Sequence, residues 1–251
     1  MYFNKLHHFI EEIKFLNNII IQPNEERILL ADSSQYEHLQ VQVAANARLT
    51  LVVQRDQGYT LTHHFELSEN SHCRLFYIYR GKNLVNQQIN VTFAGCGAVC
   101  EVWGLCEASG AAQVQTTTYV EHNAPHCSSR QLFKAIADDE AQVLFDGKIV
   151  VAAHADKTEA TQVNKNILLN GAARASAQPQ LEIYARDVKC SHGATVGQLD
   201  AEALFYLCSR GIPQPQARQM LLDSFMQEVF EQLRIESGEL RIESGELRVE
   251  N

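Results

Sequence analysis

The apolar positions near the start of the chain recur at helical spacing and predict one short amphipathic helix over residues 2–16. Pro23 follows this helix and helps to end it. From about residue 27 to residue 189 the pattern changes to short β runs, several of which alternate between apolar and polar residues as half-buried strands do. Such runs occupy residues 39–43, 49–53, 75–79, 89–93 and 148–151.

A polar or glycine corner, then a small residue and a strand, recurs along this β-rich part. If the small residues are treated as equivalent, their spacings are 26, 25, 14, 29 and 32 residues. The residues compared are Ala47, Cys73, Ala98, Ala112, Ala141 and Ala173. These spacings indicate a loose repeat of about one β-solenoid coil, with 14 residues equal to half a coil. They favour a parallel β-helix, and a two-sheet sandwich with similar strands is the alternative.

After residue 200 the apolar period becomes helical. Asp200 suits an N-cap, and Gly211 suits the position just beyond a helix end. Pro215 suits the first turn of a second helix. The predicted apolar stripe of this second helix is Ala217, Met220, Leu221, Phe225, Val229 and Leu233.

The tail repeats Leu-Arg-Ile-Glu-Ser-Gly-Glu from Leu233 and again from Leu240. A heptad hints at a coiled coil, but a glycine in each repeat costs about 1 kcal/mol relative to alanine in a helix. We therefore predict a weakly ordered, low-complexity extension. The expected organisation is a short helix and linker over residues 1–26, a β core over 27–200, a helical segment over 201–234 and the repeat tail over 235–251.

Composition and charge narrow the classes of protein. With 45% hydrophobic and 20% charged residues, the chain is expected to bury a core. The net charge is -9 and Lys/Arg clusters are never longer than two, so neither nucleic acid nor an anionic membrane is an expected partner. There is no secretory signal pattern and no membrane-spanning apolar run, and the cysteines number seven. We expect reduced thiols and a cytoplasmic location.

Motifs of the common enzyme classes are missing from the sequence. There is no phosphate-binding loop, no G-x-S-x-G elbow and no H-E-x-x-H helix. Cys96, Cys100 and Cys106 look like a thiolate site, but residues four apart on a strand lie ~13 Å apart, so we interpret them as buried structural cysteines. The stretch from His122 to Cys127 is rich in potential ligands and is interpreted as a structural loop or coil corner, with a ligand role as the alternative.

Cys190 and His192 form a better candidate for a metal site. Residues two apart on an extended segment share a face and lie ~7 Å apart at Cα, so both side chains can converge on one iron, zinc or sulfide-bearing cluster. A structural cysteine and histidine are the alternative.

These residues also carry a family resemblance. Residues 179–200, with Cys190-Ser-His192-Gly-Ala-Thr at their centre, resemble the C-terminal signature of the SufB/SufD family, the scaffold subunits of the SUF iron–sulfur assembly machinery. The resemblance covers roughly residues 30–233. Gly193 takes the place where the B-type subunit usually carries Glu, so the chain looks like the D-type subunit (SufD). Further residues that resemble family positions are His122, Pro125, 129–131, 145–147, 164–169 and 203–212.

The resemblance implies a right-handed parallel β-helix flanked by helices, and a non-catalytic scaffold in a SufBCD complex. The implied partners are a B-type subunit (SufB-like) and a SUF ATPase (SufC-like) that docks on the C-terminal helices, with a homodimer as an alternative. His192, and more weakly Cys190, would be metal ligands near the subunit interface. They would contribute to a transient iron–sulfur cluster shared with the partner, with none firmly bound by this chain alone. The expected partner-binding residues are Leu204, Phe205, Tyr206, Arg210, Gly211, Met220 and Phe225.

Two other functions compete with this one. The first is a purely structural partner subunit that never contacts a cluster. The second is a β-helix carbohydrate-acting enzyme, which the scarcity of acidic pairs at strand spacing disfavours. The chain departs from the family in the short region before its β core and in the repetitive tail.

Overall fold

The computed structural model describes residues 10–12, 18–31, 38–233, 240–243 and 246–249. The chain divides into two compact units, residues 1–196 and residues 197–251. The first unit contains two sheets of hydrogen-bonded strands, and the second contains two helices and a small two-stranded sheet.

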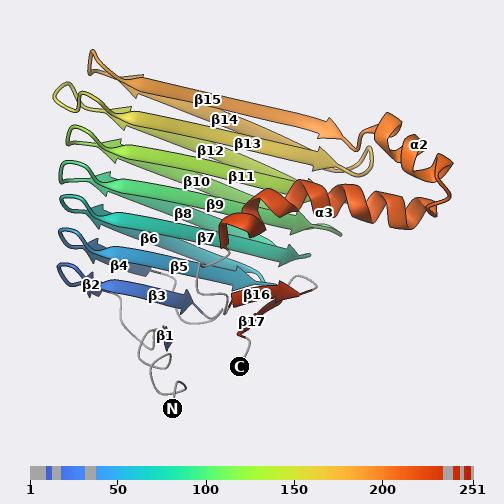
Figure 1. The fold of residues 1–251 in the computed structure, drawn as a ribbon. Helices are drawn as coiled ribbons and strands as arrows, with labels where there is room; N and C mark the ends of the chain where they lie inside the picture. Colours follow the sequence, from blue (N-terminus) through green and yellow to red (C-terminus); the bar gives the residue numbers. More distant parts are fainter. Residues whose placement is uncertain (1–9, 13–17, 32–37, 234–239, 244–245, 250–251) are drawn as a thin grey trace. The chain divides into compact units, whose positions relative to one another are not determined.

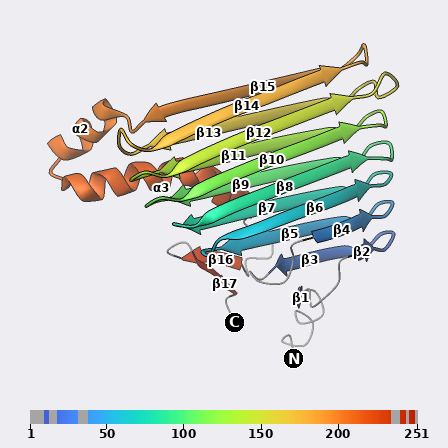
Figure 2. The same cartoon turned by 180° about the vertical axis from the view of Figure 1, so that it is seen from behind.

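The first unit is a β-solenoid, because successive strands alternate between two parallel sheets (Figures 1 and 2). One sheet has the order β1 (Ile10–Glu12), β3 (Glu26–Ala31), β5 (Arg48–Arg55), β7 (His72–Gly81), β9 (Val99–Ala108), β11 (Ser128–Ala137), β13 (Glu159–Leu168) and β15 (Lys189–Gln198). The other has the order β14 (Arg174–Ile183), β12 (Gln142–Val151), β10 (Gln113–His122), β8 (Leu84–Phe93), β6 (Tyr59–Leu67), β4 (His38–Val43) and β2 (Asn18–Ile21). The predicted parallel β-helix is confirmed, and the sandwich alternative is wrong.

The corners that precede the odd-numbered strands share one backbone conformation. Their residues have φ between 53° and 72°, the left-handed region that glycine and asparagine adopt most readily. Each N–H donates to a carbonyl of the next coil at 2.6–3.3 Å, so the corners stack into a ladder. The residues in this conformation are Asn24, Asn46, Asn70, Gly97, His126 and Lys157.

The repeat predicted from small residues mixed two sets of corners. Ala47 and Ala98 precede strands of one sheet, where the equivalent residue is Ser71 and not Cys73. Ala112, Ala141 and Ala173 precede strands of the other sheet. The interval of 14 residues between Ala98 and Ala112 is therefore half a coil, as its length indicated.

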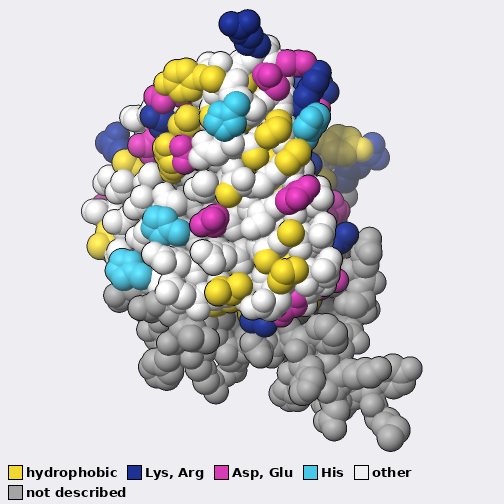
Figure 3. Space-filling model, turned by 90° about the vertical axis from the view of Figure 1, so that its left-hand side faces the viewer, with side chains coloured by type: hydrophobic (Ala, Val, Ile, Leu, Met, Phe, Trp, Pro, Cys, Tyr) yellow, Lys and Arg dark blue, Asp and Glu magenta, His cyan; other side chains and the backbone are white. Residues whose placement is uncertain are grey.

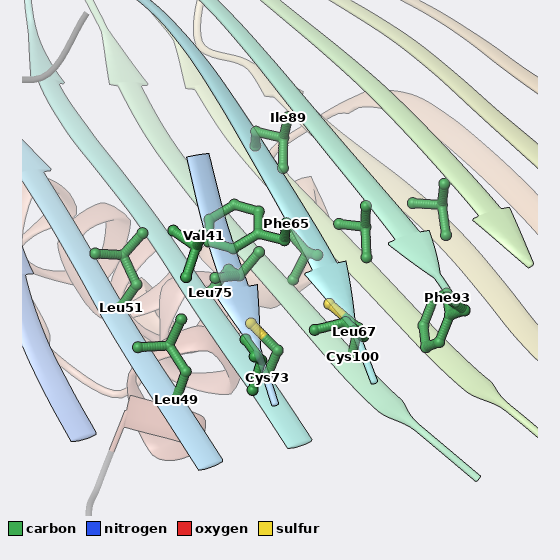
Figure 4. Packing of buried hydrophobic residues seen from close by; sticks show 14 of the residues in the cluster. Val41, Leu49, Leu51, Phe65, Leu67, Cys73, Leu75, Ile89, Phe93 and Cys100 are labelled. Atoms are coloured by element: carbon green, nitrogen blue, oxygen red, sulfur yellow. The ribbon is translucent and has the colours of Figure 1, made fainter. Parts of the chain in front are cut away.

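The core fills the space between the two sheets. Strand β10 shows the pattern, since every second side chain is buried while the others are exposed or half-buried. Equivalent side chains of successive coils stack in register, as Leu49, Cys73 and Cys100 do (Figure 4). This stacking removes apolar surface from water at about 25 cal/mol per Å², which makes the core the main stabilising contribution.

The second unit contains α2 (Ala201–Ser209) and α3 (Gln214–Leu233), which contact each other. Asp200 caps α2 as predicted, because its Oδ1 accepts hydrogen bonds from the N–H groups of Glu202 and Ala203 at 2.9 and 3.1 Å. Gly211 follows the end of α2 with φ of 88°, again as predicted.

The predicted apolar stripe of α3 is partly wrong. The buried side chains are Ala217, Leu222, Met226, Val229 and Leu233. Met220 is exposed, and Leu221 and Phe225 are only half-buried. Apolar residues occupy more than one side of this helix, so spacing alone did not identify the side that is buried.

The two ends of the chain are described only in part. Of the predicted N-terminal helix over residues 2–16, Ile10–Glu12 form strand β1, paired with β3, and the remainder lies outside the described residues. In the repeat tail, β16 (Leu240–Glu243) pairs antiparallel with β17 (Glu246–Val249). These strands come from two copies of the repeat. The sequence-based prediction of a weakly ordered extension did not include this pairing.

Candidate functional site

The last coil of the solenoid leaves one edge of each sheet open. Strands β15 and β14 are the terminal strands of their sheets, at the top of the solenoid in Figure 1. The N–H of Lys189 donates to the carbonyl of Thr158, the residue just before β13, and the N–H and C=O of one residue in a parallel strand face the same neighbour. The backbone groups of Cys190, His192 and Ala194 therefore face away from β13, towards the free edge.

Cys190 and His192 lie on β15, two residues apart, on its inward side. Ser191 Oγ lies 3.4 Å from Thr161 Oγ1, which places His192 across from Gln162 and Cys190 across from Ala160. Cys190 is half-buried and packs against the apolar core. His192 is exposed, since no further coil of the described solenoid covers it. Both residues share one face, as the spacing predicted, and their role as metal ligands stays a prediction.

Burial changes the chemistry of the Cys190 thiol. It raises the pKa of Cys190 above its usual value, and a backbone hydrogen bond at Ala160 partly offsets this. The thiol therefore keeps its proton in the free chain, and binding to a metal would release it.

Buried amide side chains lie directly beneath this end of the solenoid. Gln162 Nε2 donates to Thr118 Oγ1 and to Gln131 Oε1, both at 3.3 Å. Asn166 Nδ2 donates to Asn164 Oδ1 at 2.5 Å and to the carbonyl of Thr195 on β15 at 3.1 Å. Sequence reasoning did not select these residues for the site. The sequence feature that could have identified them is the polar residue at each alternate position of β13 from Gln162 to Asn166, on the side that faces the interior.

The other cysteines are not grouped as metal ligands in the described part of the chain. Cys96 lies at a corner, while Cys100 and Cys106 point into the core from β9. Burial raises the pKa of the Cys106 thiol to about 12 and also raises that of Cys73, which stacks beside Cys100. Within the described ranges, no three His, Cys, Asp or Glu side chains are grouped so that they could hold a metal ion.

His122 is a buried core residue. Its Nε2 lies 2.8 Å from Ser129 Oγ, and its ring stacks on Phe93 with 4.1 Å between centroids. Burial lowers the pKa of His122 to about 3, so the imidazole is neutral at physiological pH. His126 of the same stretch is an exposed corner residue. The stretch is structural, in keeping with the sequence-based interpretation.

The predicted partner-binding residues lie on and after α2 and on α3. Phe205 and Tyr206 are 76% and 56% exposed, and the Arg210 guanidinium lies 5.2 Å from the centre of the Tyr206 ring. Met220 is exposed on α3, whereas Leu204 and Phe225 are half-buried. Large exposed aromatic side chains of this kind often mark an interaction surface.

The charge distribution gives no sign of a nucleic-acid surface on the face shown in Figure 3. Lys and Arg side chains are interspersed there with carboxylates and histidines and do not gather into one patch. None of the helices in the described parts of the chain is long and apolar enough to cross a membrane.

Comparisons with known proteins identify the family. The SufBD core domain of the SUF system for FeS cluster assembly matches residues 19–225. The chain is 39% identical over 201 residues to the iron–sulfur cluster assembly protein SufD of Escherichia coli, covering 78% of this chain and 47% of that protein. It is 35% identical over 226 residues to a SufBD family protein of Synechocystis, covering 89% of this chain and 46% of that protein.

The chain therefore belongs to the SufBD family of SUF iron–sulfur cluster assembly proteins, as the residues around Cys190 and His192 indicated. A SufBD family protein of Mycobacterium tuberculosis is 32% identical over 201 residues, which are 75% of this chain and 51% of that protein. The chain spans about half the length of the curated relatives it matches.

Proposed function

We propose that this chain is a non-catalytic scaffold subunit of a cytoplasmic SUF complex, and that it pairs with a B-type subunit through the open end of its solenoid. The observation that carries this proposal is that β15 is the terminal strand of its sheet, with the backbone groups of His192 facing away from β13. The cysteines, all free in this structure, suit a reducing compartment.

Strand β15 suits strand addition better than β14 does. The N–H of Arg174 donates to the carbonyl of Ala141, the residue just before β12. Pro179 lies an odd number of residues further on, so it occupies a position facing the free edge. Proline has no N–H to offer a partner strand there. Along β15, Cys190, His192 and Ala194 each offer both backbone groups. An exposed edge of this kind readily pairs with another chain.

A strand added to β15 would bring a second subunit next to His192 and Cys190. A neutral imidazole and a thiolate are competent iron ligands. Two ligands do not complete a metal site. The described residues of this chain contain no group of three or more His, Cys, Asp or Glu side chains that could hold a metal ion. We infer that the nascent cluster, the cargo of the assembly, would be shared with the partner subunit, which supplies the remaining ligands.

Replacing Ala194 with proline should reduce co-purification of the B-type subunit at least tenfold. The proline ring removes a donor that faces the free edge and blocks the approach of another strand. The bonds of β15 to β13 are made by the alternate residues, so the melting temperature should change little. Affinity purification of the co-expressed subunits, with quantified bands, measures the effect.

The matched control is Ala194→Val, which adds a β-branched side chain but keeps the N–H. It should retain the partner. If Ala194→Pro purified with as much B-type subunit as wild type, β15 would not be the interface. A second copy of this chain pairing at the same edge would appear instead as a homodimer in size-exclusion chromatography, and that result would also contradict the proposal.

We further propose that the SUF ATPase docks on the second unit through the exposed aromatic side chains of α2. The double variant Phe205→Ala, Tyr206→Ala should lose at least tenfold of the ATPase in a pull-down and keep the B-type subunit. Both side chains are more than half exposed, so stability should stay near wild type. Leu84→Ala, which removes an equally exposed apolar side chain from β8, is the control. Full ATPase retention by the double variant would refute the assignment.

A purely structural partner subunit is the second candidate. The observation in its favour is that Cys190 and His192 lack a third described ligand within the chain. Such a subunit would form the same complex, so association cannot separate the two functions. Substitution of His192 separates them, because only the ligand role predicts a loss of cluster delivery from a folded and assembled protein.

A further inference from the structure

Gln162 carries a buried oxygen atom that has no hydrogen-bond partner among the described residues. The side chain is fully buried, yet its Oε1 accepts no hydrogen bond. Buried polar atoms are almost always paired, so an unpaired carbonyl oxygen inside a solenoid requires an explanation. Gln87, another buried glutamine, accepts from Tyr59 Oη at its oxygen and donates to Thr116 Oγ1 from its nitrogen, so this core can pair both ends of an amide.

The geometry of the amide indicates where this oxygen faces. Gln162 Nε2 donates to Thr118 and to Gln131, and both partners belong to strands of the preceding coils. The amide group is planar, with its oxygen and nitrogen on different sides of the terminal carbon. Because the nitrogen faces the preceding coils, the oxygen faces the following coil. The residue across from Gln162 in that coil is His192, as the contact between Thr161 and Ser191 shows.

We propose that Gln162 is a positioning residue for His192, whose imidazole N–H donates to the buried Oε1 when the ring turns over the end of the solenoid. This inference rests on the proposed function of His192 as a ligand. An N–H held by a carbonyl fixes which ring nitrogen carries the proton and leaves the other nitrogen free to face the partner subunit. Ligating histidines are usually oriented in this way, by a carbonyl or carboxylate behind the ring.

The polar layer beneath His192 would therefore have a purpose beyond packing. An apolar side chain in place of Gln162 would fill the same volume without holding the imidazole. Gln131 differs from Gln162, because its Oε1 accepts from Gln162 and its unpaired atom is the donor Nε2, which cannot accept an imidazole N–H. A role in holding His192 also accounts for the presence of a buried amide immediately below the exposed histidine.

The test is NMR of the full chain with ¹⁵N-labelled histidine. An imidazole N–H that donates to a buried carbonyl exchanges slowly and gives a one-bond ¹H–¹⁵N signal, which the His192→Ala protein identifies by its absence. We expect this signal in wild type, its loss in Gln162→Leu, and its retention in Gln162→Glu, which keeps an oxygen at the same place. Gln87→Leu, which removes a buried amide elsewhere, should leave the signal unchanged.

Zinc titration gives a second measurement on the same proteins. The Zn²⁺ affinity that depends on His192, measured as the difference from His192→Ala, should fall about 10–100-fold in Gln162→Leu. Absence of the imidazole signal in wild type, or its persistence in Gln162→Leu, would overturn the proposal. If Gln162→Leu does not fold, Gln162→Asn, whose shorter side chain withdraws the carbonyl from His192, should lose the signal, and retention of the signal in that variant would overturn the proposal. These measurements need no partner subunit, so their failure is distinct from failure of the proposed complex.

Discussion

Replacing His192 with alanine should leave the chain folded and associated with its partner, while cluster delivery in vivo falls at least tenfold. The imidazole is exposed at the open end of the solenoid, so its removal creates no cavity. It should lower the free energy of unfolding by about 1 kcal/mol, the net contribution of the one hydrogen bond that the imidazole is proposed to make with Gln162. Alanine supplies no metal ligand, so the substitution should impair cluster assembly and not folding. Complementation of a strain that lacks the D-type subunit measures delivery.

Thermal unfolding and co-purification of the same variant provide the control. Cys190→Ser should give a milder loss of delivery, because the half-buried thiol makes the weaker ligand of the pair. If His192 were a structural residue, its loss would cost about 1–3 kcal/mol, and activity would fall only in proportion to the folded protein. A destabilised but active His192→Ala protein would end the ligand hypothesis.

Acidification should destabilise the solenoid through His122. The pKa of this buried imidazole is lowered to about 3, whereas it is about 6.5 in the unfolded chain. Between these values the unfolded chain binds a proton that the folded chain does not. The stability contributed by neutral His122 is therefore fully present above pH 6.5 and is lost as the pH falls towards 3. The loss is about 1.4 kcal/mol per pH unit within that window.

Urea unfolding of wild type and His122→Gln at pH 7.5, 6 and 5 measures this contribution. The variant keeps a polar atom for Ser129 but has no titrating group. The substitution should lower the free energy of unfolding by about 1–3 kcal/mol at pH 7.5. Below pH 6.5 the stability of the variant should depend less steeply on pH than that of wild type. Equal slopes for the two proteins would show that His122 is not the source of acid sensitivity.

The solenoid could be predicted from the sequence because its coils repeat a local pattern. Corners that need a left-handed conformation select asparagine or glycine, and strands alternate because only one side packs inside. The buried side of α3 was harder to predict. Apolar residues such as Met220 and Leu222 lie on different sides of the helix, and only tertiary packing decides which side is buried.

The site was predictable only in part for a related reason. Cys190 and His192 share a face in any extended segment, so spacing was enough to pair them. Which residues lie beneath them depends on how β13 and β15 align, and that register is set by contacts between coils. The orphan oxygen of Gln162 and the free edge of β15 therefore became visible only in the folded chain.

The most direct test of the scaffold function is anaerobic iron and sulfide analysis of the complex, purified through this chain from cells that also express the B-type subunit and the ATPase. We expect the wild-type complex to carry both iron and acid-labile sulfide, and the His192→Ala complex to contain the same subunits with at least tenfold less of each. Equal iron and sulfide in the two complexes would contradict a ligand role for this chain and leave it a structural partner.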